Sequence, residues 1–278
     1  MAKVSLFDKQ VFNEFKGYAS LLFGFIGAVV IFVDIPAKQK IAAGIACILV
    51  LFVGYLWLWF RANGLREINL TIEESTVVIK TGDIFKQEGL KVIAFNEYFD
   101  TQVDERIIAQ ASLNGKFIRE YCDCSVSELD AYIENYRFDS DEIKEINADR
   151  PEGKKQKFEI GTICVYHDYI LTALSKFNRH NEAYLTMPEY LGFLINFWDK
   201  VNRVYAQKSV SVPIFGSGLT RIKGHKIIDE QDLLKIMLWT FRISEMRFKH
   251  PAKLTIMIHE GKIDKVNLLE LKTARNGL

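Results

Sequence analysis

Cysteine is scarce in this chain, and the four that occur are scattered: Cys47, Cys122, Cys124 and Cys164. They do not form the two closely spaced pairs of a structural zinc site. Scattered thiols are typical of a reducing compartment, so we expect reduced cysteines in a cytosolic setting. A metal held by Cys122 and Cys124 is the less favoured alternative. The prediction is therefore no metal site and no bound cofactor.

An excess of charge of either sign is also missing. The 36 Lys and Arg residues almost balance the 35 Asp and Glu residues, which leaves a formal net charge of +1. Such a balance gives no electrostatic reason for nucleic acid to bind. No nucleic-acid partner is expected.

Motifs that mark several enzyme classes are absent. The five histidines are dispersed, without a His-Glu-x-x-His pattern, and there is no Gly-x4-Gly-Lys-Ser/Thr loop. A Gly-x-Gly-x-x-Gly fingerprint with its acidic partner is missing too. The serine in Phe215-Gly-Ser-Gly-Leu219 lacks the spacing of a nucleophile elbow. We therefore predict no catalytic residues.

Charged residues are missing from two long apolar runs near the N-terminus, 17–33 and 41–60. Each run approaches the ~20 residues that a helix needs to cross the hydrocarbon core of a membrane. Two transmembrane helices are predicted, at about 17–35 and 41–60, and a polar turn joins them into a hairpin. Residues 1–16 mix lysines with apolar side chains, which predicts an amphipathic segment at the membrane surface.

Basic residues are more frequent at the ends of this hairpin than in its turn. They are Lys3, Lys9, Lys16, Arg61 and Arg66 at the ends, and Lys38 and Lys40 in the turn. The positive-inside rule therefore predicts both termini in the cytoplasm. A cleaved signal peptide is not favoured, because no Ala-x-Ala-like site follows the first run. Ser20, Gly24 and Ala28 form a small-residue stripe that suits packing between chains or within the hairpin.

Residues 66–278 show the patterns of an α/β domain, in which helices pack on a mixed sheet. Strands are predicted at 67–72, 76–80, 91–95, 158–165, 169–176, 212–215 and 254–259, and helices at 103–121, 125–136, from 186 onward and at 229–246. The charge-dense stretch 137–157 is predicted to be a solvated loop. The order of strand, helix and strand over 212–259 predicts two parallel strands with a right-handed crossover.

The stretch Val212-Pro-Ile-Phe-Gly-Ser-Gly-Leu-Thr-Arg221 follows an apolar strand and precedes a helix. This order forms a cradle for phosphate, because glycines let the backbone turn sharply and free N–H groups can point at the anion. A plain tight turn explains the two glycines equally well. Asn96 to Thr101 follow another buried strand, at the end where open α/β sheets place ligands.

Four short motifs together resemble a known family. They are Gly82-Asp-Ile-Phe85, Asn96-Glu-Tyr-Phe-Asp-Thr101, Ser112-Leu-Asn-Gly115 and Gly216-Ser-Gly-Leu-Thr-Arg221. Val78 to Phe85 is similar to the opening strand of macro domains, with its Gly-Asp-Ile signature, and Pro213 to Leu219 is similar to the second phosphate loop of that fold. The ordered set resembles the divergent macro domains of Thoeris antiphage effectors, in the branch where two transmembrane helices precede the macro domain. The resemblance covers nearly the whole chain.

This resemblance implies a ligand, an ADP-ribose-derived messenger, and a role for each matching residue. The implied ligand-binding residues are Asp83 and Ile84 at the adenine, Gly216, Ser217, Gly218 and Leu219 around the pyrophosphate with Phe215 beside them, Asn96, Asp100 and Thr101 at the ribose end, and Arg221 as a counter-charge. Alternatives are a turn cap for Asp83 and an ordinary salt bridge for Arg221. The bulky, acidic loop after Asn96 replaces the glycine-rich loop of macro hydrolases, which favours a reader of a modified ADP-ribose.

The function implied is that of a membrane-anchored defence effector. In this family a partner TIR-domain enzyme consumes NAD and makes the messenger, for this branch a histidine conjugate of ADP-ribose. Binding would drive homo-oligomerisation at the bacterial inner membrane, with the macro-like domain in the cytoplasm, followed by membrane disruption and abortive infection. The alternatives are an anchored ADP-ribosyl hydrolase, in which Asp100 or Glu97 activates water, and a tethered structural module.

Overall fold

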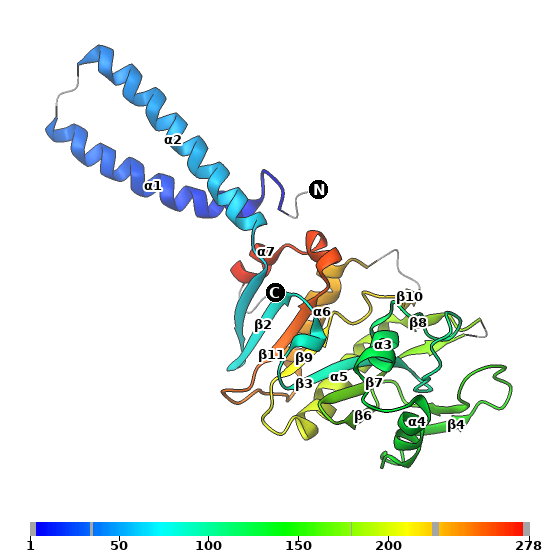
Figure 1. Cartoon of the computed structure of the whole chain (residues 1–278). Helices are drawn as coiled ribbons and strands as arrows, with labels where there is room; N and C mark the ends of the chain where they lie inside the picture. The colour runs from blue at the N-terminus through cyan, green and yellow to red at the C-terminus, as the bar shows by residue number, and fades with distance from the viewer. Residues whose placement is uncertain (1–3, 34–35, 179, 224–227, 275–278) are drawn as a thin grey trace.

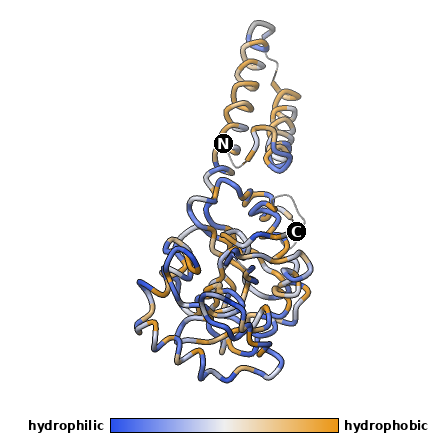
Figure 2. The backbone as a smooth tube through the Cα atoms, turned by 90° about the vertical axis from the view of Figure 1, so that its right-hand side faces the viewer, coloured by the Kyte–Doolittle hydropathy of each residue, from blue (hydrophilic) through white to orange (hydrophobic). Residues whose placement is uncertain are grey.

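Two long helices project from an α/β domain in the computed structural model of the chain (Figure 1). The structure describes residues 4–33, 36–178, 180–223 and 228–274. Helix α1 (Lys9–Phe32) and helix α2 (Ala37–Asn63) form the predicted hairpin. Both are long and apolar enough to cross a membrane, and hardly any of either helix is buried. Figure 2 shows the hairpin as mostly hydrophobic, whereas the domain mixes both kinds of residue.

The start of α1 differs from the sequence prediction. Residues 9–16, predicted as part of a separate amphipathic segment, continue directly into the apolar run as one helix. Asp8 accepts hydrogen bonds from the N–H groups of Gln10 and Val11, at 2.8 and 3.2 Å, and so caps this helix. Helix α2 begins inside the predicted turn, of which residues 34–35 lie outside the described residues.

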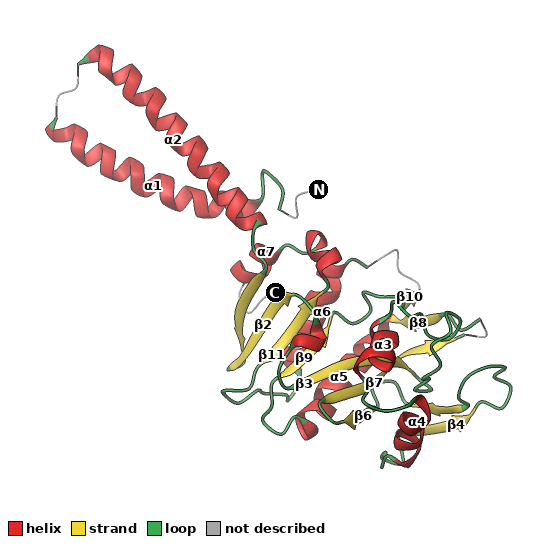
Figure 3. Ribbon diagram, in the orientation of Figure 1, coloured by secondary structure: helices red, strands yellow, loops and turns green. Residues whose placement is uncertain are grey.

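A mixed sheet forms the centre of the domain (Figure 3). Its order in the described structure is β1-β2-β11-β9-β3-β7-β8-β10, with β6 also paired to β7. The strands are β1 (Glu67–Ile72), β2 (Ser75–Thr81), β3 (Leu90–Asn96), β6 (Ile163–Tyr166), β7 (Tyr169–Phe177), β8 (Ala183–Thr186), β9 (Val210–Pro213), β10 (Arg221–Lys223) and β11 (Leu254–Ile258). Strands β2, β11, β9, β3 and β7 run parallel, so their carboxyl ends share one edge. The predicted parallel pairing of β9 and β11 is confirmed.

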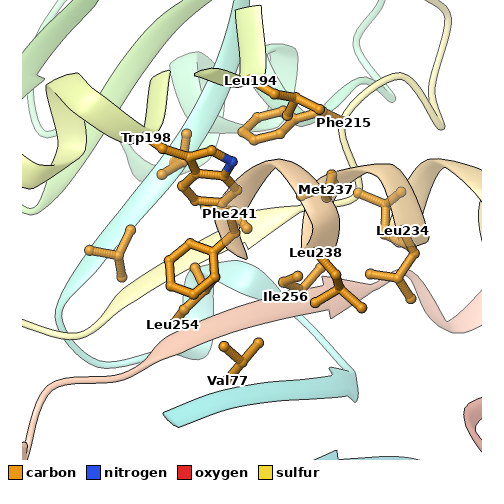
Figure 4. Packing of buried hydrophobic residues seen from close by; sticks show 14 of the residues in the cluster. Val77, Leu194, Trp198, Phe215, Leu234, Met237, Leu238, Phe241, Leu254 and Ile256 are labelled. Carbon is orange, nitrogen blue, oxygen red and sulfur yellow. The ribbon is translucent and has the colours of Figure 1, made fainter. Parts of the chain in front are cut away.

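Helices α5 (Met187–Val204) and α6 (Glu230–Ile243) pack against one face of the sheet. Thr186 and Glu189 form the capping box that starts α5, where a helix is predicted from residue 186 onward. Figure 4 shows Trp198 of α5 and Phe241 of α6 meeting side chains of β2 and β11, and the two rings lie 5.3 Å apart. This core fixes the positions of β9 and β11, and therefore of the loops that follow them.

A second hydrophobic core covers the other face of the sheet. In this part of the domain the structure differs from the sequence prediction in two places. Residues 103–121 do not form one helix; only α3 (Leu113–Lys116) and the following turn η2 (Phe117–Tyr121) are helical. Asp104 accepts hydrogen bonds from the N–H groups of Arg106 and Ile107, at 2.9 and 2.8 Å, and such local bonds compete with helix formation. Helix α4 (Val126–Asn135) forms as predicted.

The predicted solvated loop 137–157 is also more ordered than its charge density indicates. Within it, β4 (Ile143–Ile146) pairs with β5 (Gln156–Phe158). Arg150 is only 6% exposed, because it is inserted beneath the loop that follows β3. This stretch is therefore part of the domain's folded structure.

The hairpin is seated on the domain by α7 (Leu268–Thr273), close to the end of the described chain. Leu269 of α7 belongs to a small buried cluster with Val4, Val11, Leu58 and Ala62. Asn267 donates a hydrogen bond from Nδ2 to Oδ2 of Asp8, at 3.1 Å. Figure 1 shows α7 directly beneath the base of the hairpin.

Candidate functional site

The shared edge of the parallel strands brings the predicted site segments together. Asp83 and Ile84 follow β2, the 214–220 loop follows β9, and Asn96 ends β3. Strand β11, between β2 and β9, delivers His259 to the same edge. Because parallel strands of an open sheet place ligands beyond their carboxyl ends, this edge is the candidate site.

A cleft of about 660 Å³ opens beside Asp83. Its lining includes Asp83, Ile84, Phe85, Tyr121, Pro213, Met257 and His259. Asp83 uses Oδ1 to accept a hydrogen bond from the Phe85 N–H, at 3.0 Å, and so caps the short helix η1 (Ile84–Lys86). Asp83 therefore does act as a turn cap. Its other carboxylate oxygen, Oδ2, accepts no hydrogen bond from the described residues and can accept one from a ligand.

One wall of this cleft is apolar and flat. The rings of Phe85 and Tyr121 stack at 3.8 Å between centroids, with 4° between their planes. Within the described part of the chain, the N–H of Ile84 has no acceptor. A carboxylate oxygen, a free N–H and a flat apolar wall are the features that a planar heterocycle with donor and acceptor groups requires.

The 214–220 loop turns sharply at Gly216, whose φ of +79° favours glycine. Phe215 is buried among the aromatic side chains of α5, so its ring supports the loop from below. Its carbonyl accepts a hydrogen bond from the buried hydroxyl of Tyr190, at 2.9 Å. The Ser217 N–H donates to the Ile214 carbonyl at 3.3 Å, whereas those of Gly218 and Leu219 have no acceptor among the described residues.

Lys262 is a site residue that the sequence reasoning missed. It lies in η3 (Glu260–Lys265), just after β11, and its Nζ donates a hydrogen bond to the Ser217 carbonyl. The same Nζ lies 3.2 Å from a carboxylate oxygen of Glu230. Burial alone would raise the pKa of Glu230, but hydrogen bonds from Lys262 and Lys265 contribute to lowering it. The one signal available was position, since Lys262 follows a strand that neighbours β9.

The polar atoms of Asn96 and Asp100 are occupied by internal bonds. Asn96 donates from Nδ2 to Oδ2 of Asp100 at 2.8 Å, and its Oδ1 accepts from the N–H groups of Tyr98 and Asp100. Arg150 donates to both carboxylate oxygens of Asp100, at 2.6 and 3.0 Å. Its guanidinium also stacks on the ring of Tyr98, 3.8 Å from the centroid. Arg150, also missed at the sequence level, therefore holds this loop in shape.

The Thr101 hydroxyl is also occupied by an internal hydrogen bond. It donates to Asp130 at 2.5 Å, at the rim of a second opening of about 700 Å³ that Lys154 also lines. Glu97 is buried, and its burial raises the pKa of its carboxyl, although the Phe177 N–H donates to it at 3.2 Å. The ligand contacts predicted for Asn96, Asp100 and Thr101 remain predictions.

Arg221 directly follows the 214–220 loop and is exposed at the start of the edge strand β10. It pairs with Tyr184 of β8 in the sheet and forms no ion pair among the described residues. The described part of the chain contains no group of three or more His, Cys, Asp or Glu side chains that could hold a metal ion. Cys122 and Cys124 are free thiols with 2.7 Å between their sulfur atoms.

The chain is similar to several known proteins. A family model described as "Thoeris protein ThsA, Macro domain" matches residues 77–259. A Thoeris protein ThsA of Bacillus amyloliquefaciens (strain Y2) is 39% identical over 261 residues, which covers 89% of this chain and 84% of that protein. Among solved structures, the Oceanobacillus iheyensis macrodomain with MES bound has a TM-score of 0.47 at 14% identity, covering 73% of this chain and 94% of that one. The same macrodomain with ADP has a TM-score of 0.45 at 14% identity, covering 74% and 94%. This chain therefore belongs to the family of the Thoeris ThsA proteins, and residues 77–259 carry its macro domain.

Proposed function

We propose that this chain is a membrane-anchored receptor of antiphage defence whose macro domain binds an ADP-ribose-derived messenger. The family supports a role in the Thoeris system and an ADP-ribose-related ligand. A partner TIR-domain enzyme would supply the messenger from NAD, in this branch as a histidine conjugate. Binding then drives association of chains in the bacterial inner membrane and disrupts it, which ends the infection with the death of the cell.

The cleft at Asp83 is the observation on which the proposal mainly rests. Oδ2 of Asp83 can accept a hydrogen bond from the adenine amino group while Oδ1 keeps the Phe85 N–H. The free N–H of Ile84 can donate to a ring nitrogen of the same base. Because Ile84 lines the cleft, a ligand acceptor would replace water at this N–H, and such a hydrogen bond contributes about 0.5–1.5 kcal/mol net.

The pyrophosphate would occupy the 214–220 loop. The N–H groups of Gly218 and Leu219 are free, and Gly216 lets the backbone curve around an anion. Lys262, bonded to the Ser217 carbonyl beneath the loop, adds a positive charge at the same place. Charge-assisted hydrogen bonds of this kind are worth roughly 1.5–3 kcal/mol each.

The hairpin would anchor the receptor and act on the membrane. Apolar side chains such as Phe25, Ile48 and Phe52 are 71%, 68% and 59% exposed, which is costly in water and favourable in lipid. Because the basic residues gather at the hairpin ends, the macro domain would face the cytoplasm.

The hydrolase alternative has less support from the geometry. Asp100 is 1% exposed and both of its oxygens accept hydrogen bonds from Arg150, so this carboxylate is poorly placed to activate water. Glu97 is 5% exposed and bonded to the Phe177 N–H. A receptor function requires neither carboxylate to react.

Calorimetric titration of the full chain in detergent with ADP-ribose and its amino-acid conjugates tests the proposal. Saturable binding with the ligand recovered intact by mass spectrometry supports a receptor, whereas turnover supports the hydrolase. Asp83→Asn keeps the cap acceptor but turns a donor towards the adenine amino group, so we expect binding to weaken roughly tenfold or more. Glu88→Gln, which neutralises an exposed carboxylate five residues further along the chain, is the matched control. Equal affinities of the two variants would remove the adenine assignment.

A further inference from the structure

One continuous segment touches both the 214–220 loop and the membrane hairpin. It comprises η3, Asn267 and α7, residues 260–273, and we call it the C-terminal bridge. It follows β11, the strand between the two ends of the proposed nucleotide site. The chain itself joins the domain to the hairpin at residues 64–66, and the bridge is an additional connection between them.

The first end of the bridge lies under the 214–220 loop. The Lys262 ammonium donates to the Ser217 carbonyl and contacts Glu230, which begins α6. The Lys262 side chain is 28% exposed, so the cation is partly withdrawn from water. A phosphate oxygen is a stronger acceptor for an ammonium group than a neutral carbonyl is. An anion bound at this loop would therefore draw Nζ towards itself and away from Ser217.

The second end of the bridge holds the first turn of the hairpin. The Asn267 side chain makes two contacts: its Oδ1 caps α7 by accepting from the Glu270 N–H at 3.1 Å, and its Nδ2 donates to Asp8 at 3.1 Å. Asp8 in turn caps α1. The Asn267 side chain thus caps α7 and at the same time contacts Asp8, the residue that caps the first predicted transmembrane helix. Beside it, Leu269 packs between α1 and α2.

Between its two ends the bridge is clamped to α6. The Asn267 N–H donates to Oε1 of Gln231 at 2.9 Å, and Lys235 contacts Glu270 at 2.6 Å. Gln231 directly follows Glu230, the carboxylate that pairs with Lys262. A change in the Lys262–Glu230 contact therefore acts next to the residue that positions Asn267.

We propose that the C-terminal bridge couples occupancy of the 214–220 loop to the seating of the hairpin. Phosphate binding takes Lys262 from the Ser217 carbonyl, the bridge shifts along the start of α6, and the Asn267–Asp8 contact transmits the shift to α1. This inference rests on the proposed function, since it needs a phosphorylated ligand at the loop. Coupling of this kind is reciprocal, so the seating of the hairpin also sets the affinity for the ligand.

Hydrogen–deuterium exchange of the full chain in lipid nanodiscs, with ADP-ribose as the probe, tests this coupling. In the wild type we expect ligand to slow exchange in residues 214–219 and to change exchange in residues 8–12. Asn267→Ser keeps a capping oxygen for α7 but lacks the donor to Asp8. The loop of this variant should still be protected by ligand, and residues 8–12 should no longer respond.

Lys262 has a matched control in the same helical turn. Lys265 also contacts Glu230 at 3.2 Å but makes no contact with Ser217 among the described residues. Lys262→Met should weaken ADP-ribose binding roughly tenfold and abolish the response at residues 8–12, whereas Lys265→Met should change neither. A wild-type loop without ligand protection would overturn the proposed function and the coupling together. A protected loop with silent residues 8–12, or a full response in Asn267→Ser, would overturn the coupling alone.

Discussion

Arg150 donates two hydrogen bonds to the carboxylate of Asp100, and the side chains of this pair are only 4% and 1% exposed. The arginine comes from a charged loop and the aspartate from the segment after β3, so the pair fastens two irregular stretches to each other. A further hydrogen bond to Oδ1 of Asp100 comes from the Lys154 N–H, at 2.8 Å. The segment after β3 is thus held in place by a buried ion pair.

Removing one partner of this ion pair should lower the free energy of unfolding of the domain. Arg150→Leu leaves the Asp100 carboxylate buried without its cation, and we expect the free energy of unfolding to fall by about 3 kcal/mol. Arg106→Leu is the control, because Arg106 and Glu152 form an exposed ion pair whose loss should cost less than about 0.5 kcal/mol. Urea denaturation of both variants measures the difference. Similar losses would contradict a structural role for the buried pair.

The backbone of the 214–220 loop predicts a difference between its two glycines. Gly216 has a φ of +79°, so Gly216→Ala should destabilise the fold by roughly 1 kcal/mol and distort the loop. A Cβ at Gly218 would meet no atom within 4 Å and no positive φ is required there. Thermal denaturation should therefore separate the variants, with Gly218→Ala close to wild type. Reversal of this order would show that the loop has another conformation in solution.

Glu189 provides a pH-dependent prediction. Burial alone would raise the pKa of Glu189, but hydrogen bonds from Lys176 and from Thr186 lower it to about 2. A carboxyl whose pKa is lower in the folded state stabilises the fold above its unfolded pKa, and this contribution is lost as pH falls through the folded pKa.

Glu189→Gln keeps the capping-box geometry and removes the charge. We expect it to lower the free energy of unfolding by about 2 kcal/mol at neutral pH, a value reduced for the partial exposure of the ion pair. The difference from wild type should shrink as pH falls from 4.5 towards 2, where the folded-state carboxyl is protonated. Denaturation curves across this range test the assignment, and a difference independent of pH would contradict it.

Membrane insertion of the hairpin can be tested at the centre of α2. Leu49 is 57% exposed, and a lysine at mid-span costs about 3 kcal/mol on insertion scales. Leu49→Lys should therefore reduce the fraction of chain that resists carbonate extraction from membranes. Val126→Lys, at an apolar side chain of α4 that is 45% exposed, should leave that fraction unchanged. Equal extraction of the two variants would argue that the hairpin does not lie in lipid.

Sequence patterns predicted the elements whose signals are local. The uncharged runs identified α1 and α2, alternation of apolar and polar residues located β1 and β2, and the pattern of a buried strand located β3. The order of elements after residue 212 correctly predicted a parallel pair of strands. The mixed sheet and the family resemblance are confirmed as well.

The features that were missed depend on contacts between distant segments. Arg150 is buried because Asp100, 50 residues away, needs a cation, and nothing near Arg150 in the sequence indicates this. Lys262 lies 45 residues from the carbonyl of Ser217 that it contacts. In place of the helix expected at 103–121, backbone N–H groups donate hydrogen bonds to the carboxylates of Asp104 and Glu105, which a count of apolar positions does not detect. Contacts between segments that are distant in the sequence therefore determine much of the geometry of the candidate site.

The contact between Asp8 and Asn267 spans 259 positions of the chain. During synthesis the hairpin is made before α7, so the two can meet only after the intervening α/β domain has been translated. Nascent and prematurely terminated chains would therefore carry a hairpin that α7 does not yet hold. Seating of the hairpin through this contact therefore follows synthesis of the α/β domain.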